Sequence, residues 1–160
     1  MPTLHLMVGL PCSGKTTAAR ALEQQFSALR LTTDEWHIRL FGDDFWDADD
    51  PDHRRHNERH QLLEALLWDV ARRTLSLGVD VVLDFGCWSR AEREAFREKA
   101  HSVGAELRIH FTDADDDVLL ARLAARNAER PQGTFKIAEL ELREWIGWFE
   151  RPSPDELKRA

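Results

Sequence analysis

The chain has 160 residues, with 22 basic and 29 acidic side chains and a formal net charge of −7. An acidic chain is a poor non-specific partner for nucleic acid, because such binding depends on lysine and arginine displacing counterions. Two cysteines are too few for a disulfide framework, and neither a signal peptide nor a membrane-spanning stretch can be recognised. We therefore expect one cytoplasmic domain over residues 1–160 without a membrane partner, while its oligomeric state stays open.

The chain begins with a strand, a glycine-rich turn and a helix. Apolar residues 3–8 predict a short buried strand, and residues 17–22 predict a helix. Between them, Gly9–Thr16 has the spacing G-x-x-x-x-G-K-[ST] of a phosphate-binding loop, the Walker A motif or P-loop. Glycines let consecutive backbone N–H groups turn towards an anion, and the helix start adds its positive dipole end. A chance match is the alternative, which the flanking strand and helix disfavour.

The polar side chains of this loop each have a use in nucleotide binding. Lys15 is long enough to reach the β- and γ-phosphates, and the Thr16 hydroxyl is a suitable ligand for Mg²⁺. ATP is the expected nucleotide, although no base-reading motif excludes GTP. The residues expected to hold it are Gly9, Pro11, Cys12, Ser13, Gly14, Lys15, Thr16 and Thr17.

Strands and helices alternate through the next part of the chain. Residues 28–32 predict a second strand, after which Thr33 or Asp34 would cap a short helix that ends near residue 40. A polar stretch over residues 42–52 is expected to be a loop. A long helix follows and ends at Gly78. Its apolar stripe comprises Leu62, Leu63, Leu66, Leu67, Val70, Ala71 and Leu75.

The second half of the chain continues this alternation. Residues 79–84 predict a third strand that ends in a carboxylate, and residues 105–111 predict a fourth. A break with proline and glycine over residues 131–134 separates the last two helices. The expected helices run over residues 89–102, about 113–128 and 137–149, followed by a solvated tail over about 151–160.

This alternation predicts an α/β fold with a mostly parallel sheet and helices on both faces. Ligands of such sheets bind beyond the carboxyl ends of the strands. The phosphate-binding loop follows the first strand, Asp34 follows the second, and Asp84 ends the third. We therefore expect these three features to meet at one edge of the sheet.

Both aspartates are candidates for chemistry at that edge. Asp84 directly follows a buried strand, so it could hold Mg²⁺ through water or orient an acceptor, whereas a solvated turn is the alternative. Asp34 could accept a proton from an acceptor hydroxyl as general base, or it could be a plain helix cap. Position alone does not decide between these two roles for Asp34.

Three arginines, Arg122, Arg126 and Arg130, share one helix face just before the break. Such a row could close over a nucleotide and neutralise charge on the γ-phosphoryl group, as a lid over about residues 122–136. The alternative is a solvated basic face.

Aromatic and histidine residues give weaker signals. Trp36, Phe41, Phe45, Trp46 and Trp88 could line a pocket for an organic acceptor, although core packing is the simpler interpretation for any one of them. Trp145, Trp148 and Phe149 are expected on the buried face of the last helix. His53, His56 and His60 are spaced for one helix face, but their polar neighbours favour a solvated helix start over a metal site. Cys12 and Cys87 are expected to be unpaired thiols.

Taken together, these residues make the chain resemble a group of small P-loop kinases. The group includes the kinase module of phage polynucleotide kinase, zeta toxins and chloramphenicol phosphotransferase, and the resemblance runs from residue 3 to about residue 149. The loop motif is specific for nucleotides, whereas the other motifs are short. The resemblance implies a three-layer P-loop fold with strand order 2-3-1-4 and an arginine-bearing helical lid.

The resemblance also implies roles for single residues. Asp34, within Thr33-Asp34-Glu35-Trp36, corresponds to the general base, and Asp84 corresponds to an acceptor or metal contact. Arg126 corresponds to a lid arginine, with Arg122 and Arg130 as neighbours. His37 stands where the phage-type kinase has an arginine for the acceptor phosphate, which weakens a nucleic-acid interpretation. The expected acceptor contacts are Asp34, Trp36, His37, Arg39, Asp84 and Trp88.

Three functional hypotheses follow. The first is an ATP-dependent kinase that phosphorylates a hydroxyl of a small organic molecule, with Lys15, Asp34 and Arg126 as catalytic residues. The second is a 5′-hydroxyl polynucleotide kinase, which the acidic charge makes less favoured. The third is a nucleotide-gated regulatory ATPase that transfers nothing. The sequence does not identify the acceptor.

Overall fold

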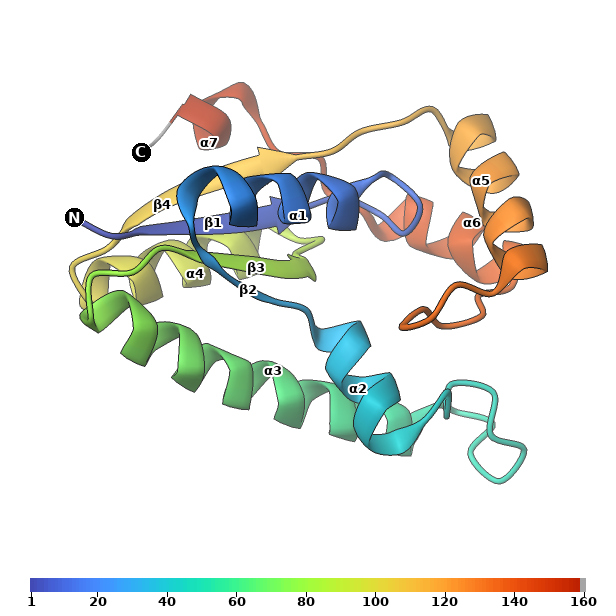
Figure 1. Ribbon diagram of the computed structural model, residues 1–160. Coiled ribbons are helices and arrows are strands. Elements are labelled where there is room, and N and C mark those ends of the chain that lie inside the picture. Colours follow the sequence, from blue (N-terminus) through green and yellow to red (C-terminus); the bar gives the residue numbers. More distant parts are fainter. Residues whose placement is uncertain (159–160) are drawn as a thin grey trace.

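The structure is a computed structural model that describes residues 1–158. Within these residues, four strands form a parallel sheet in the order β2-β3-β1-β4, which confirms the predicted α/β fold and strand order (Figure 1). The strands are β1 (Thr3–Val8), β2 (Leu29–Leu31), β3 (Val81–Gly86) and β4 (Glu106–Phe111).

Strand β1 is the centre of the sheet, and each of its residues is buried. It pairs with β3 on one side, Leu6 opposite Leu83, and with β4 on the other side, Leu6 opposite Ile109. Because all pairs are parallel, the carboxyl ends of β1, β3 and β4 point to the same edge of the sheet. The segments that follow these strands are therefore neighbours in space.

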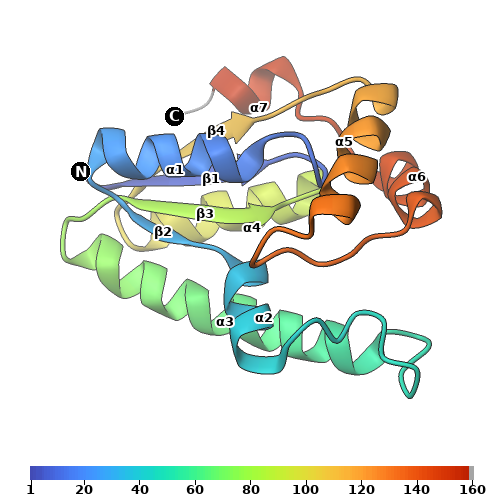
Figure 2. The same ribbon diagram turned by 45° about the vertical axis from the view of Figure 1, so that its right-hand side comes forward.

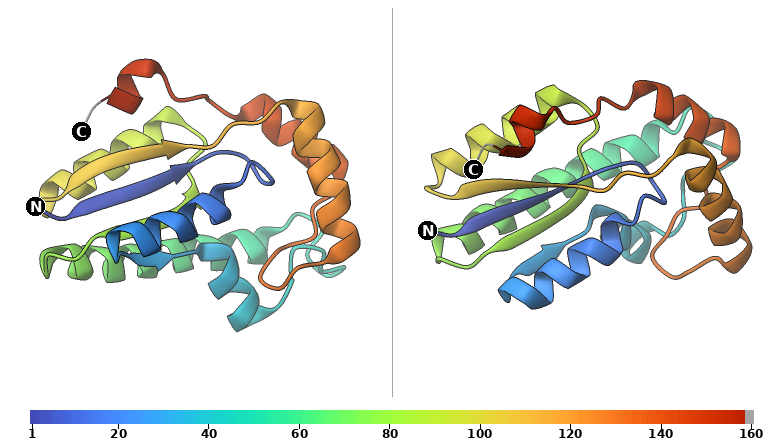
Figure 3. Two further views of the ribbon diagram at one scale, coloured as in Figure 1. Left: turned by 45° about the horizontal axis from the view of Figure 1, so that its top comes forward. Right: turned by 90° about the horizontal axis from the view of Figure 1, so that it is seen from above.

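Helices cover both faces of this sheet (Figure 3). Alternate residues of β1 point to opposite faces. Leu4, Leu6 and Val8 pack against α3 and α4, whereas Met7 packs with Ala19 under α1. The helices are α1 (Lys15–Phe26), α2 (Thr33–Phe41), α3 (Arg54–Ser76), α4 (Arg90–Ser102), α5 (Asp116–Glu129), α6 (Glu139–Trp148) and α7 (Pro154–Lys158).

Helices α5 and α6 stand beyond the carboxyl ends of the strands, and the segment between them reaches towards α2 (Figure 2). They share a separate apolar cluster in which Leu10 of the phosphate-binding loop packs with Leu119, Leu123 and Leu142. This second cluster anchors α5 and α6 next to the loop that follows β1. None of the helices in the described part of the chain has both the length and the apolar character needed to cross a membrane.

The predicted apolar stripe of α3 is only half buried. Leu63, Leu67, Ala71 and Leu75 lie in the core, as expected, since they follow one another at intervals of four residues. Their neighbours on the stripe are exposed because α3 touches the sheet along a narrow line that one such row fills. The exposed fractions are 60% for Leu62, 53% for Leu66 and 41% for Val70.

The prediction of a solvated tail is wrong for residues 154–158. Residues 154–158 form α7, next to β4, and the carboxylate of Glu156 is 2% exposed. Glu156 Oε1 accepts a hydrogen bond of 2.8 Å from Arg93 Nε on α4, and the Arg93 side chain is 1% exposed. A buried charge needs such a partner, so the pair fixes α7 against the rest of the fold. Residues 159–160 of the expected tail lie outside the described residues.

Replacement of Glu156 is predicted to destabilise the fold and to change its response to acid. Arg93 holds the pKa of Glu156 at about 2, against an ordinary value of 4.5. The stabilisation by this carboxylate is therefore complete above about pH 4.5 and is lost as the pH falls towards 2. We expect Glu156→Gln to lower the free energy of unfolding at pH 7 by about 3–5 kcal/mol, since it leaves Arg93 buried without a counterion. Urea unfolding between pH 7 and pH 3 measures both effects.

The matched control is Glu139→Gln on α6, whose carboxylate pairs with Arg143 at 2.7 Å on the surface. Exposed pairs contribute about 0–1 kcal/mol, so this variant should unfold like the parent chain. Equal stability of the Glu156→Gln chain and the control, or an unchanged acid response, would contradict a structural role for the Arg93–Glu156 pair.

Candidate functional site

A large cleft opens where the strands end. It has a volume of about 1350 Å³ and is lined by residues of the phosphate-binding loop, α2, the start of α3 and the α5–α6 region. Lys15, Asp34, Asp84 and Arg126 all line it. The structure therefore brings together residues that are up to 111 positions apart along the chain.

The backbone of Gly9–Thr16 is shaped for an anion. Gly9 has a φ of 151°, and a Cβ atom there would lie 2.6 Å from the Thr112 carbonyl oxygen, so only glycine fits. Gly14 is the left-handed N-cap of α1, and no side chain caps this helix start among the described residues. The first N–H groups of α1 are thus available for phosphate oxygens, at the positive end of the helix dipole.

Asp84 meets the start of α1 directly. Thr16 Oγ1 donates a hydrogen bond of 2.8 Å to Asp84 Oδ2, and Asp84 is 7% exposed. Burial raises the pKa of Asp84, while the nearby Lys15 ammonium and the Thr16 hydrogen bond oppose this shift. A hydroxyl and a carboxylate oxygen are the donors that Mg²⁺ prefers, so Thr16 and Asp84 fit that ion.

Lys15 is close enough to both carboxylates of the cleft for their charges to act on it. Its Nζ donates to the Leu10 carbonyl oxygen at 3.0 Å. Burial lowers the pKa of Lys15, whereas the charges of Asp84 and Asp34 favour the ammonium form. The positive charge of Lys15 is therefore offset by two carboxylates. A phosphate group that binds Lys15 would come close to both of them.

Asp34 lies in the first turn of α2 and faces the cleft. The N-cap is Thr32, so the interpretation of Asp34 as a helix cap is wrong. The surrounding protein raises the pKa of Asp34 by desolvation. The positive charges of Lys15 and Arg126 oppose this shift, and Lys15 has the larger effect of the two. These cations favour the carboxylate form, which is the form that can accept a proton.

Two members of the arginine row reach the cleft. Arg122 Nη1 donates to the Cys12 carbonyl oxygen at 3.2 Å, and Arg126 Nη2 donates to the Phe135 carbonyl oxygen at 2.9 Å. Arg130 does not line the cleft, because α5 ends there and Arg130 takes the left-handed C-cap conformation with a φ of 48°. The helical spacing that placed all three arginines on one face therefore fails at its last member.

Only some of the expected acceptor contacts line the cleft. Trp88 does, together with the two aspartates. Trp36 and Arg39 do not, since successive residues of α2 turn by about 100° and these two lie on other sides of the helix from Asp34. His37 lies on the same side as Asp34 but does not line the cleft either, because its ring is packed against His56 of α3. Trp36 is 47% exposed, whereas His37 is fully buried.

Aromatic side chains that were not expected as acceptor contacts also line the cleft. Trp145 and Trp148 line the cleft instead of forming the buried face of α6, which is made by Leu142. Phe149 is only partly buried and packs against two apolar clusters. No sequence pattern singled out Phe135, which follows the expected break and is buried at the cleft wall. Phe45, one of the aromatic residues considered for an acceptor pocket, lines the cleft. Cleft residues that we did not predict include Asn57, Ile137, Glu141 and Glu144.

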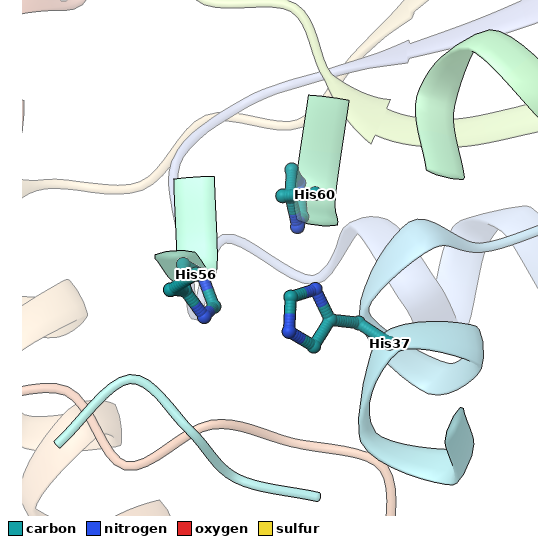
Figure 4. A group of neighbouring side chains, drawn as sticks. All are labelled: His37, His56 and His60. Atoms are coloured by element: carbon teal, nitrogen blue, oxygen red, sulfur yellow. The ribbon is translucent and has the colours of Figure 1, made fainter. Parts of the chain in front are cut away.

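The histidine row also differs from its expected solvated state. His53, His56 and His60 all line the cleft, and His56 is only 6% exposed. The rings of His56 and His60 lie next to that of His37 from α2 (Figure 4). The polar residues around His56 in the sequence did not indicate its contact with His37, because that contact depends on the packing of α2 against α3. Cys12 and Cys87 are free thiols.

Comparisons with known proteins show the family and the fold. A family model described as an AAA domain (AAA_33) matches residues 4–152. A candidate kinase from Chloroflexus aurantiacus J-10-fl is 18% identical with a TM-score of 0.74, and the match covers 96% of this chain and 83% of that chain. No curated protein matches the chain.

Two further solved structures have the same fold. A gluconokinase from Sinorhizobium meliloti 1021 is 18% identical with a TM-score of 0.63, over 96% of this chain and 78% of that chain. A chain of the Pnkp1/Rnl/Hen1 RNA repair complex is 19% identical with a TM-score of 0.67, over 99% of this chain and 50% of that chain. Since the AAA domain match spans almost the whole sequence, the chain belongs to that family and has the fold of the small P-loop kinases.

Proposed function

We propose that the chain transfers the γ-phosphoryl group of ATP to a hydroxyl group of a small organic acceptor. The observation that carries this proposal is the position of Asp34 in the same cleft as Lys15, Asp84 and Arg126. A nucleotide-binding site alone needs no second carboxylate opposite the loop. A phosphotransferase does need one, to orient the acceptor and take its proton.

The nucleotide would lie along the phosphate-binding loop. Backbone N–H groups at the start of α1 would bind its phosphate oxygens, and Lys15 would leave the Leu10 carbonyl oxygen to contact the β- and γ-phosphates. Thr16 and Asp84 are the residues suited to hold Mg²⁺, Asp84 through water. When bound, this ion would neutralise charge on the phosphate oxygens.

Asp34 would act as general base. Its carboxylate accepts the proton of the acceptor hydroxyl while the hydroxyl oxygen forms a bond to the γ-phosphorus. The bond from that phosphorus to the bridging oxygen of ADP breaks, and ADP leaves with the electron pair. Arg126, on the proposed lid over residues 122–136, would turn from the Phe135 carbonyl oxygen towards the moving phosphoryl group.

The far end of the cleft indicates which acceptors fit. Its walls combine the rings of Trp88, Trp145 and Trp148 with the carboxylates of Glu141 and Glu144. Among the described residues, the lysine and arginine side chains that line the cleft belong to Lys15 and Arg20 on α1 and to Arg122 and Arg126 on α5. An apolar, acidic wall favours a neutral or cationic acceptor with an apolar or aromatic part and disfavours an anionic one.

A panel of acceptors tests the proposal. We expect neutral or cationic hydroxyl compounds with an aromatic or apolar part to stimulate ADP release, with one phosphate ester formed for each ADP. Sugar phosphates and 5′-hydroxyl oligonucleotides should have at least about tenfold lower kcat/KM, a difference of about 1.4 kcal/mol. Selective phosphorylation of oligonucleotides would instead support a polynucleotide kinase. ATP loss that no acceptor stimulates would support a regulatory ATPase.

Asp34→Asn is expected to separate nucleotide binding from transfer. The amide keeps the size of the side chain but cannot accept the proton, so kcat should fall by about 10²–10⁴. The dissociation constant for ATP should stay within about twofold, because Asp34 does not belong to the loop. The same substitution at Asp52, which is exposed on the loop before α3, is the control. Full turnover by Asp34→Asn would overturn the base assignment.

Arg126→Ala should lower kcat by about 10²–10³, since it removes a cation from the site where charge develops in transfer. Arg130→Ala offers a matched control, because Arg130 belongs to the same sequence row but lies outside the cleft. Single-turnover rates measured at saturating ATP distinguish the two. Equal losses in both variants, or no loss in Arg126→Ala, would contradict a role for Arg126 in transfer.

A further inference from the structure

Three histidine rings from two helices converge beside the acceptor end of the cleft. His37 comes from α2, and His56 and His60 lie four residues apart on α3 (Figure 4). One ring nitrogen from each lies within 4.8 Å of the other two. The proposed phosphoryl transfer uses none of them. We propose that these three histidines bind one first-row transition-metal dication of the Zn²⁺ class.

Asp44 orients two of the rings for this role. Its Oδ1 accepts hydrogen bonds from His37 Nε2 at 2.8 Å and from His56 Nδ1 at 2.7 Å, while Arg59 Nη1 donates to its Oδ2 at 2.7 Å. A neutral imidazole carries one N–H group, so these bonds leave the lone pairs on His37 Nδ1 and His56 Nε2. A carboxylate behind a metal-binding histidine commonly fixes the ring in this way.

The cluster also contains polar atoms that the protein itself leaves unsatisfied. His37 Nδ1 and His60 Nδ1 are buried and have no hydrogen-bond partner within residues 1–158. The His37 ring is fully buried, and Figure 4 shows ring nitrogens of His37 and His60 turned towards each other. Buried polar atoms without a partner are unfavourable. A cation between them would satisfy both.

The donor set selects the kind of ion. Imidazole nitrogens suit Zn²⁺, Co²⁺, Ni²⁺ and Cu²⁺, whereas Mg²⁺ and Ca²⁺ prefer oxygen. Small ring rotations would bring the three nitrogens to the Zn–N distance of about 2.0–2.1 Å. Because His56 and His60 line the cleft, the fourth coordination position would be open to water or to an oxygen of the acceptor.

Metal binding by the chain without nucleotide or acceptor tests this inference independently of the phosphotransferase proposal. The full chain, free of any affinity tag and treated with a chelator, is titrated with Zn²⁺ by calorimetry and with Co²⁺ by visible absorption. We expect one equivalent of each, intensified Co²⁺ bands typical of four coordination, and no competition from Mg²⁺. A hundredfold excess of Zn²⁺ over its dissociation constant should raise the thermal midpoint by about 5 °C or more. Absence of Zn²⁺ binding would overturn the proposal.

Variants identify the ligands. His60→Gln should weaken Zn²⁺ binding at least about a hundredfold, and Asp44→Asn should weaken it by about 10–100-fold. His101→Gln, on exposed α4 surface, is the matched control and should bind like the parent chain. Parental affinity of the His60→Gln variant would overturn the assignment.

A measurement on the unaltered chain keeps the test decisive where a variant fails to fold. Zn²⁺ should shift the imidazole ¹⁵N resonances of His37, His56 and His60 and leave the other four of the seven histidines unchanged. Shifts confined to a different set of histidines would contradict the site.

Discussion

The parallel pairing of β1 with β3 is the constraint on which the rest of the site depends. It places the start of the phosphate-binding loop beside the last residues of β3, which include Asp84, and the 2.8 Å hydrogen bond from Thr16 Oγ1 to Asp84 Oδ2 joins the two segments. Gly9 N also donates to the Gly86 carbonyl oxygen at 3.1 Å, which ties the start of the loop to the end of β3. A shift in this register would separate the anion-binding turn from the carboxylate suited to Mg²⁺.

Electrostatic interactions connect Asp34, the second carboxylate of the cleft, to the phosphate-binding loop. The charges of Lys15 and Arg126 act on Asp34, while Asp34 and Asp84 both act on Lys15. Without a nucleotide, the cations and carboxylates of the cleft therefore balance each other. A triphosphate would replace the carboxylates as partners of Lys15 and Arg126, and Asp34 would then face an acceptor. In the proposed reaction this exchange links nucleotide binding to the position of the base.

The features of the fold and site that could be predicted from the sequence are those set by a local pattern of residues. The loop spacing, the apolar strands and a carboxylate at the end of an apolar run all lie within a few residues, so the fold and the nucleotide edge could be predicted, although β3 continues for two residues past Asp84. The interpretation of Asp34 as a helix cap was wrong, because the N-cap of α2 is Thr32, two residues earlier. Helix boundaries of this kind are the least certain part of a pattern.

Contacts between distant segments were not predictable from those patterns. His56 looks solvated among its polar neighbours, yet α2 covers it, and the tail looks polar, yet Arg93 on α4 buries Glu156. Trp145 and Trp148 have the spacing of a helix face, but Leu142 is the α6 residue buried against α5, and both tryptophans line the cleft. In each case the partner lies elsewhere in the chain, and its identity decides whether a side chain is buried.

A crystal structure of the chain with Mg²⁺ and a non-hydrolysable ATP analogue would show whether the triphosphate and Asp34 face each other in the cleft. We expect the β- and γ-phosphates against the N–H groups of Gly9–Thr16, with the γ-phosphate between Lys15 and Arg126 and its far side open towards Asp34. Phosphates bound away from this turn, or an Asp34 carboxylate directed out of the cleft in that complex, would contradict this arrangement.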